Sequence, residues 1–168
     1  MVSRFNWRTI LSVAFAVLAL GCTKAPNVLD SSTSKTIFFF TKDFRFYDLG
    51  FIKSYTNYTS LEIFNAGVAL LKMDCYENTI CLNAKCYAKD SIMRRFFGSD
   101  TFNDLDFRAI LKGQEIFDGE NKIMLLDGFQ QSIGRAGLTL DYQVTNAPSI
   151  TLRVKDLQQH TLFSLSID

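Results

Sequence analysis

The chain has 168 residues, and its 18 basic and 17 acidic side chains give a net charge of +1 at pH 7. A nearly neutral chain gives no electrostatic reason to expect nucleic-acid binding, because phosphate backbones are held mainly by clustered Lys and Arg. The single His excludes a metal site built from several His residues of one chain, and sixteen Phe residues can fill an apolar core or line an apolar cavity.

The first 21 residues have the pattern of a secretory signal. Arg4 and Arg8 precede an apolar run over residues 10–20, and no acidic residue stands before it. This run is eleven residues long, whereas a helix that spans a membrane needs about 20 apolar residues. A basic start followed by a short apolar segment is typical of a signal peptide. We therefore expect residues 1–21 to be removed from the mature protein.

The end of this run, Ala19-Leu20-Gly21-Cys22, resembles a bacterial lipobox. The resemblance implies cleavage before Cys22 and a diacylglyceryl group on its thiol, which would anchor the protein to a membrane. Thr23 replaces the Asp that retains lipoproteins in the inner membrane, which implies an outer-membrane location facing the periplasm. If cleavage falls elsewhere, Cys22 is an ordinary residue.

Residues 22–35 are polar and contain Pro26, which indicates a flexible tether before one domain over residues 36–168. The triplet Asp48-Leu49-Gly50 has the composition of a turn. Apolar, β-branched and alternating runs predict strands in the first half of this domain over residues 36–41, 51–58, 61–64 and 67–76.

Two short helical stretches are expected next. Asp90 is a candidate N-cap for residues 91–97, which Gly98 would end. Asn103 or Thr101 is the candidate cap of a second stretch that ends at Lys112. Its apolar residues recur at helical spacing and are Leu105, Phe107, Ile110 and Leu111.

Further strands are expected over residues 122–126, 129–133, 138–145, 150–154 and 161–167. Strands, a short helical insert and then more strands fit a mainly β fold of the α+β class. We expect a curved antiparallel sheet, or open half-barrel, with the helices on its concave face.

Motifs of the common enzyme classes are absent from the sequence. No Ser-nucleophile, zinc-protease, dinucleotide-binding or P-loop pattern occurs, and His160 lies in a polar segment typical of a solvated loop. Close acidic pairs, Asp104 with Asp106 and Asp118 with Glu120, fall in polar stretches and are interpreted as solvated surface. Spacing alone does not exclude a glycosidase-type pair. We expect no catalytic residue, no metal and no cofactor.

Three cysteines lie between Cys75 and Cys86. Gaps of five and four residues and the lack of a fourth ligand argue against zinc, and an oxidising periplasm favours a disulfide. A two-residue turn at Glu77-Asn78 would place Cys75 on the apolar face and Cys81 opposite Asp74 on the polar face. We therefore favour a Cys81–Cys86 bridge over Cys75–Cys81, and expect Cys75 to be a small core residue.

The order of elements resembles the LolA/LolB family of lipoprotein-localisation proteins, in which LolB is the outer-membrane receptor. The resemblance rests on Ile110-Leu111-Lys112-Gly113 before the returning strands and on Pro148-Ser149-Ile150 near the end. The chain is also similar to small outer-membrane lipoproteins with a C-x4-C pattern before a short helix. Here Cys81, Cys86 and residues 93–97 match that pattern, which supports location rather than activity.

The LolB resemblance implies an open half-barrel closed by helices, with an apolar cleft that takes acyl chains of lipoproteins delivered by a periplasmic carrier. Transfer driven by relative affinity needs a dry cleft and no catalytic group. Leu49 is the candidate for the apolar residue that LolB carries on a protruding loop. The residues expected to line the cleft are Leu71, Met73, Phe96, Phe97, Phe107 and Leu111.

Two other classes of function remain open. A small lipoprotein can serve as a structural or assembly subunit of an outer-membrane complex, through sheet edges and an exposed apolar patch. The third class is a hydrolase, against which the single loop-like His and the lack of a nucleophile motif argue. Lipid retained by the protein would favour the first reading, and a stoichiometric protein partner the second.

Overall fold

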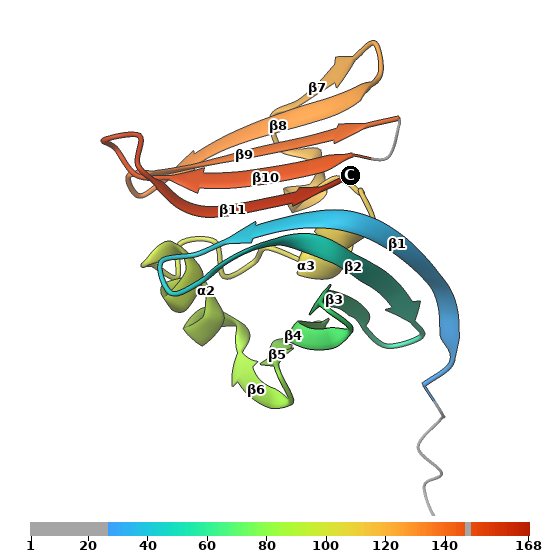
Figure 1. The fold of residues 1–168 in the computed structure, drawn as a ribbon. Helices are drawn as coiled ribbons and strands as arrows, with labels where there is room; N and C mark the ends of the chain where they lie inside the picture. Colours follow the sequence, from blue (N-terminus) through green and yellow to red (C-terminus); the bar gives the residue numbers. More distant parts are fainter. Residues whose placement is uncertain (1–26, 147–148) are drawn as a thin grey trace, which may run out of the picture.

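An open antiparallel sheet forms the scaffold of the molecule (Figure 1). The computed structural model describes residues 27–146 and 149–168, so the expected signal and Cys22 lie outside the described residues. The eleven described strands are ordered β6-β5-β4-β3-β2-β1-β11-β10-β9-β8-β7, which pairs the first strand with the last at the centre of the sheet. The expectation of a mainly β fold with an antiparallel sheet and a short helical insert is confirmed.

The strands are, in chain order, β1 (Leu29–Phe40), β2 (Arg45–Tyr55), β3 (Thr59–Asn65), β4 (Val68–Cys75), β5 (Thr79–Leu82), β6 (Lys85–Ala88), β7 (Lys122–Leu125), β8 (Gly128–Arg135), β9 (Leu138–Thr145), β10 (Ile150–Lys155) and β11 (Thr161–Ile167). The helical segments between β6 and β7 are α2 (Lys89–Phe97), α3 (Phe107–Leu111) and the 3-10 turn η1 (Phe117–Gly119).

The first strand starts well before residue 36, where the sequence predicted it. β1 begins at Leu29 and pairs with β2 over its whole length, with Ser31 opposite Ser54 and Lys35 opposite Gly50. Residues 29–35, which were expected to belong to the tether over residues 22–35, are therefore part of β1. This part of the strand was not predicted because its Ser and Thr residues give only a weak strand signal. Their side chains are exposed, and pairing with β2 holds them in the strand.

The triplet Asp48-Leu49-Gly50 is not a turn but the middle of β2. The connection between β1 and β2 is formed by residues 41–44 instead. Gly50 marks a close approach, because a Cβ at this position would overlap the carbonyl oxygen of Glu62 and Cδ1 of Ile37. The glycine is thus required by contacts inside the sheet, which explains why turn composition was misleading here.

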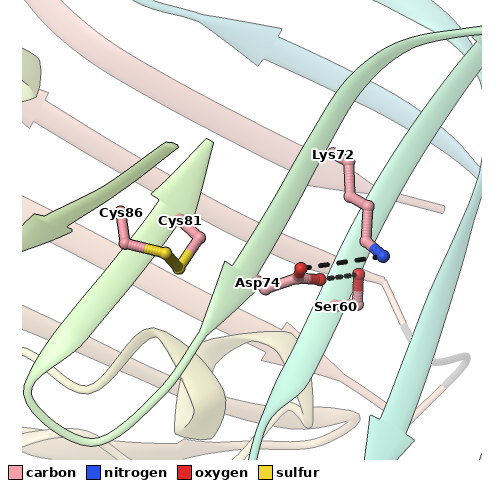
Figure 2. Close-up of a disulfide and its surroundings, with 5 residues drawn as sticks. All are labelled: Ser60, Lys72, Asp74, Cys81 and Cys86. Carbon is pink, nitrogen blue, oxygen red and sulfur yellow. Dashed lines mark hydrogen bonds and ion pairs between the residues drawn. A yellow bond between two sulfur atoms is a disulfide. The ribbon is translucent and has the colours of Figure 1, made fainter. Parts of the chain in front are cut away.

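The cysteine-rich hairpins have the expected register. On β4 and β5, Asp74 lies opposite Cys81 and Cys75 lies opposite Ile80. Cys81 and Cys86 are directly opposite each other on β5 and β6 and form the expected disulfide. Figure 2 shows this bridge beside the polar face of β4, where the carboxylate of Asp74 accepts a hydrogen bond from a serine of β3.

The helix α2 ends as expected but begins differently. Gly98 terminates it in the left-handed conformation (φ 73°) and donates its N–H to the carbonyl of Arg94. The N-cap is Ala88, whose side chain cannot cap, and Asp90 lies in the first turn instead. There Asp90 forms an ion pair of 2.7 Å with Arg94, one turn further along.

The helix α3 is shorter than the expected stretch. Asp106 is its N-cap and accepts a hydrogen bond of 2.9 Å from the backbone N–H of Arg108, so the caps expected at Thr101 or Asn103 are wrong. Residues 99–104 form turns, in which the Ser99 and Thr101 hydroxyls bond to each other and compete with helix formation. The four apolar residues expected to share a helix face are nevertheless all buried.

A cluster of phenylalanine rings joins the helices to the centre of the sheet. The Phe163 ring on β11 lies 5.3–6.0 Å, between centroids, from the rings of Phe39, Phe96, Phe97 and Phe107. All five side chains are buried. Each such ring pair adds about 0.5–1.5 kcal/mol beyond area burial, so this part of the molecule is a packed core.

Candidate functional site

An aliphatic cavity of about 450 Å³ opens at the end of the molecule where β1 extends past β11. Pockets that hold small ligands enclose roughly 300–1,000 Å³, so this volume suits a small molecule or a single apolar chain. The wall combines residues from β2, the end of α3, β9, β10 and β11. Its aliphatic side chains are Ile52, Leu111, Val144, Ile150 and Ile167.

The remainder of the cavity lining is polar and comes mainly from β1. Ser31, Thr33 and Lys35 share one face of the strand, because alternate residues of a strand point to the same side. Ser54 lies opposite Ser31 on β2, and Lys112 follows α3. Two Lys residues therefore accompany the aliphatic wall.

The segment after α3 is fixed against β9 at the back of the cavity. Gly113 has a positive φ of 66°, and a Cβ there would lie 3.3 Å from Cγ1 of Val144. The hydroxyl of Tyr142 donates a hydrogen bond of 2.9 Å to the carbonyl of Gln114. Burial raises the pKa of Tyr142, so the hydroxyl stays protonated and available as a donor.

The residues expected to line a cleft are divided among three places. Leu111 lines the aliphatic cavity. Leu71, Met73 and Phe107 are buried in the packed core and line neither this cavity nor the hollow described next. Leu49 lies within β2 and is 60% exposed, so the expectation that it stands on a protruding loop is wrong.

A second hollow of about 640 Å³ lies beside the end of α2, and Phe96 and Phe97 are among its lining residues. Its walls also carry Asp43, Arg94 and Arg95, and Arg95 forms an ion pair of 3.1 Å with Asp43. Placing an apolar ligand against charged groups removes their solvent, which is costly. This hollow has four charged side chains, whereas the aliphatic cavity has two beside five aliphatic ones, so the aliphatic cavity is the better candidate for an apolar ligand.

The end of the molecule that holds the cavity also carries exposed apolar side chains. Leu126, in the turn between β7 and β8, is fully exposed, and Met124 on β7 is 70% exposed. This turn lies at the same end of the sheet as the end of β9 and the start of β10 (Figure 1). The N–H of Asn146 donates to the carbonyl of Asp127, which ties the turn to the segment after β9.

The cavity offers hydroxyl groups but lacks the usual means to activate them. Among the described residues that line it, none is a His or a carboxylate, the bases that most often activate Ser or Thr. His160 lies in the exposed turn between β10 and β11, as expected, with Nδ1 3.2 Å from the carboxylate of Asp156. In residues 27–146 and 149–168, no cluster of three His, Cys, Asp or Glu residues could hold a metal ion.

Three of the four acidic residues that the sequence singled out form ion pairs, namely Asp104, Asp106 and Glu120. Asp104 and Glu120 both contact the guanidinium of Arg135, at 2.9 and 2.6 Å. Asp106 caps α3 and pairs with Arg108 at 2.9 Å, and these contacts hold the pKa of Asp106 below its usual range against the effect of burial. These carboxylates thus stabilise the turns around α3.

The three described cysteines have separate structural roles. Cys81 and Cys86 are joined, and Cys75 is a free thiol buried in the core, as expected. Burial raises the pKa of Cys75 far above its usual range, so the thiol stays protonated and unreactive.

Comparison with known protein families finds no family that matches this chain, and comparison with curated proteins finds no significant match. Within the described part of the chain, none of the helices is long and apolar enough to cross a membrane.

Proposed function

We propose that the protein is an outer-membrane lipoprotein, anchored through Cys22 and facing the periplasm, that binds the acyl chain of a lipid or a lipidated protein without catalysis. The observation that carries this proposal is the aliphatic cavity with its polar rim. In this proposal the molecule is a LolB-like half-barrel, and the helices close its concave side beside the cavity.

The chemistry of the cavity favours an acyl chain over a polar ligand. Burying one methylene group yields about 0.8 kcal/mol, so the aliphatic wall alone can hold a chain of several carbons. Lys112 at the rim suits a phosphate or carboxylate at the end of such a chain. An acyl chain that moves from a weaker to a tighter binding site needs no catalytic group, because the difference in affinity drives the transfer.

The exposed apolar residues around this end of the molecule indicate how the protein would be oriented at the membrane. Leu126 and Met124 project from the β7–β8 hairpin, and Val28 and Leu29 at the start of β1 are about half exposed. We infer that these side chains contact the membrane, which would bring the cavity close to the lipid surface. Leu126 then takes the role of the protruding apolar residue, for which the resemblance to LolB had made Leu49 the candidate.

A fluorescent fatty-acid analogue tests the proposal by titration against the purified full-length protein. We expect saturable binding that Val144→Trp weakens at least about tenfold, because the indole would fill the cavity. The matched control is Val68→Trp, which places the same side chain on an exposed strand position away from the cavity and should bind like the wild type. Equal binding by both variants, or none by the wild type, would contradict the proposal.

A second candidate, an assembly subunit, is favoured by one observation. Tyr47, Leu49 and Phe51 alternate along β2 on its outer face and are 71%, 60% and 38% exposed. Such a stripe suits a protein partner. Affinity capture of one stoichiometric partner, lost in Leu49→Ser and accompanied by no bound lipid, would favour this function over lipid binding.

A further inference from the structure

A hollow of about 330 Å³ lies on the outer face of the sheet, which points away from the helices. It shares no lining residue with the aliphatic cavity. The Phe39 ring on β1 packs against the Phe96 ring on α2, and successive side chains of a strand point to opposite faces. Phe38 and Phe40 therefore lie on the outer face, where they supply the apolar part of the hollow.

Strand register places four residues of the hollow in one row across the sheet. Phe40 on β1 lies opposite Arg45 on β2 and opposite Ser164 on β11. Ser164 in turn lies opposite Arg153 on β10. Neighbouring strands are about 4.8 Å apart, so the two Arg residues stand at the ends of a row whose backbone spans about 14 Å. Both Arg side chains line the hollow between them.

These two Arg residues differ from the other Arg residues of the described chain. Four of the six form ion pairs with Asp side chains, and these are Arg94, Arg95, Arg108 and Arg135. Asp141 lies opposite Arg153 on β9, but its carboxylate pairs with Lys155 and accepts a hydrogen bond from Ser132. Within residues 27–146 and 149–168, Arg45 and Arg153 form no ion pair, so the hollow has two positive charges without an anionic partner there.

Arg45 is held over the hollow by an aromatic ring. Its guanidinium carbon lies 5.4 Å from the centre of the Phe38 ring, which is a cation–π contact. A ring carries no net charge and does not neutralise the guanidinium. The N–H donors of Arg45 therefore remain available to an anion.

Ser164 places a hydroxyl group between the two Arg residues. Its side chain lines the hollow and is only 6% exposed, and its hydroxyl bonds to none of the described residues. A buried hydroxyl without a partner is costly, so a ligand oxygen that accepts its hydrogen would be stabilised here. Thr161, at the start of β11, adds a second hydroxyl to the lining.

The donors of the hollow match a phosphate monoester better than a carboxylate. A phosphate monoester carries a charge of about −1.5 to −2 at pH 7 and has three acceptor oxygens. It can therefore balance two guanidinium groups and accept a hydrogen bond from a hydroxyl at the same time. A carboxylate has one negative charge and two oxygens. The two Phe rings suit an apolar or aromatic group that carries the phosphate.

We propose that this hollow binds the phosphate monoester group of a ligand that has an apolar or aromatic body. Arg45 and Arg153 contact the phosphate from two sides, the Ser164 hydroxyl donates to it between them, and the body of the ligand packs on Phe38 and Phe40. The phosphate belongs to a soluble molecule or to a lipid headgroup, because both present the same oxygens. This site lies outside the aliphatic cavity and does not depend on the proposed function.

Calorimetric titration of the purified full-length protein with phenyl phosphate tests the site. We expect saturable binding of one ligand per chain, which Arg153→Gln weakens at least about tenfold through the loss of charge-assisted hydrogen bonds. The matched control is Lys85→Gln, which also removes one positive charge but from β6 at the far edge of the sheet, and it should bind like the wild type. Equal affinities in the two variants would overturn the proposal.

Two further measurements test the chemistry of the site. Benzoate, which carries a single negative charge, should bind at least about tenfold more weakly than phenyl phosphate. Ser164→Ala should weaken the binding of phenyl phosphate about threefold or more and leave the urea midpoint unchanged, because this hydroxyl has no partner among the described residues. Benzoate that binds as tightly as phenyl phosphate would overturn the assignment of a phosphate.

A short-chain phosphatidic acid distinguishes the two sources of the phosphate, since it presents a lipid headgroup with a phosphate monoester in soluble form. Tighter binding of phosphatidic acid than of phenyl phosphate would assign a lipid headgroup, and the reverse order would assign a soluble ligand. In either case Arg153→Gln must weaken the binding, because the aliphatic cavity could also hold the acyl chains. Absence of binding by both probes would overturn the proposal, whereas it would leave the binding of fatty acids in the cavity unaffected.

Discussion

At the scale of single residues, Gly50 has the clearest structural role. It sits where β2 lies between β1 and β3, and its missing side chain leaves room for Ile37 and the backbone of Glu62. Both neighbours belong to the centre of the sheet, where one is a core side chain and the other a backbone oxygen. The backbone oxygen of Glu62 cannot move without disturbing strand pairing.

We predict that Gly50→Ala lowers the free energy of unfolding by about 2–3 kcal/mol, because an added methyl group overpacks the site. The control is Gly134→Ala, since a Cβ at Gly134 meets no atom within 4 Å and should change stability little. Urea unfolding followed by circular dichroism measures both variants. A Gly50→Ala protein as stable as the Gly134→Ala protein would show that the close approach is not rigid.

At the scale of elements, the hairpins around the disulfide were the most predictable part of the chain. Alternation in residues 67–76 and the turn at Glu77-Asn78 correctly predicted which cysteine faces the core and which two pair. The turn of the second hairpin uses Asn83 and Ala84, both with positive φ. The bridge therefore closes a short loop at the entrance to α2.

We predict that the double variant Cys81→Ser, Cys86→Ser loses about 2 kcal/mol of stability, the loop-entropy value for a loop this short. Loss of the bridge should loosen β5, β6 and the start of α2 before the rest of the sheet. Hydrogen exchange of these segments, compared with that of β9 as a reference, measures the effect. Peptide mapping under non-reducing conditions that finds Cys75 bridged would contradict the pairing.

The elements that the sequence missed share a physical cause. β9 and β11 have the expected bounds because their apolar alternation is regular and their turns are rich in polar residues. The start of β1 was missed because residues 29–35 have exposed polar side chains and are held by pairing alone. The cap at Ala88 was missed because its side chain cannot cap a helix and gives no signal in the sequence, and the cap at Asp106 was missed because residues 101–104, expected to be helical, form a turn.

At the scale of the whole molecule, the sequence predicted an apolar interior but not where it is hollow. Leu71 and Phe107 have the same apolar character as Ile150 and Ile167, yet the first two are packed and the last two line the cavity. Which residues border empty space depends on how the strands and the end of α3 are arranged around them in three dimensions. The Phe content favoured a packed core, with an apolar cavity as the alternative.

The central claim is that the cavity holds an acyl chain, and native mass spectrometry of the protein extracted from its membrane tests it most directly. The account predicts one non-covalently bound lipid or acylated peptide per chain, in addition to any lipid attached at Cys22. It also predicts that Val144→Trp abolishes the bound species and Val68→Trp does not. A wild-type spectrum that contains only the bare chain, or the chain with a protein partner and no lipid, would contradict the account.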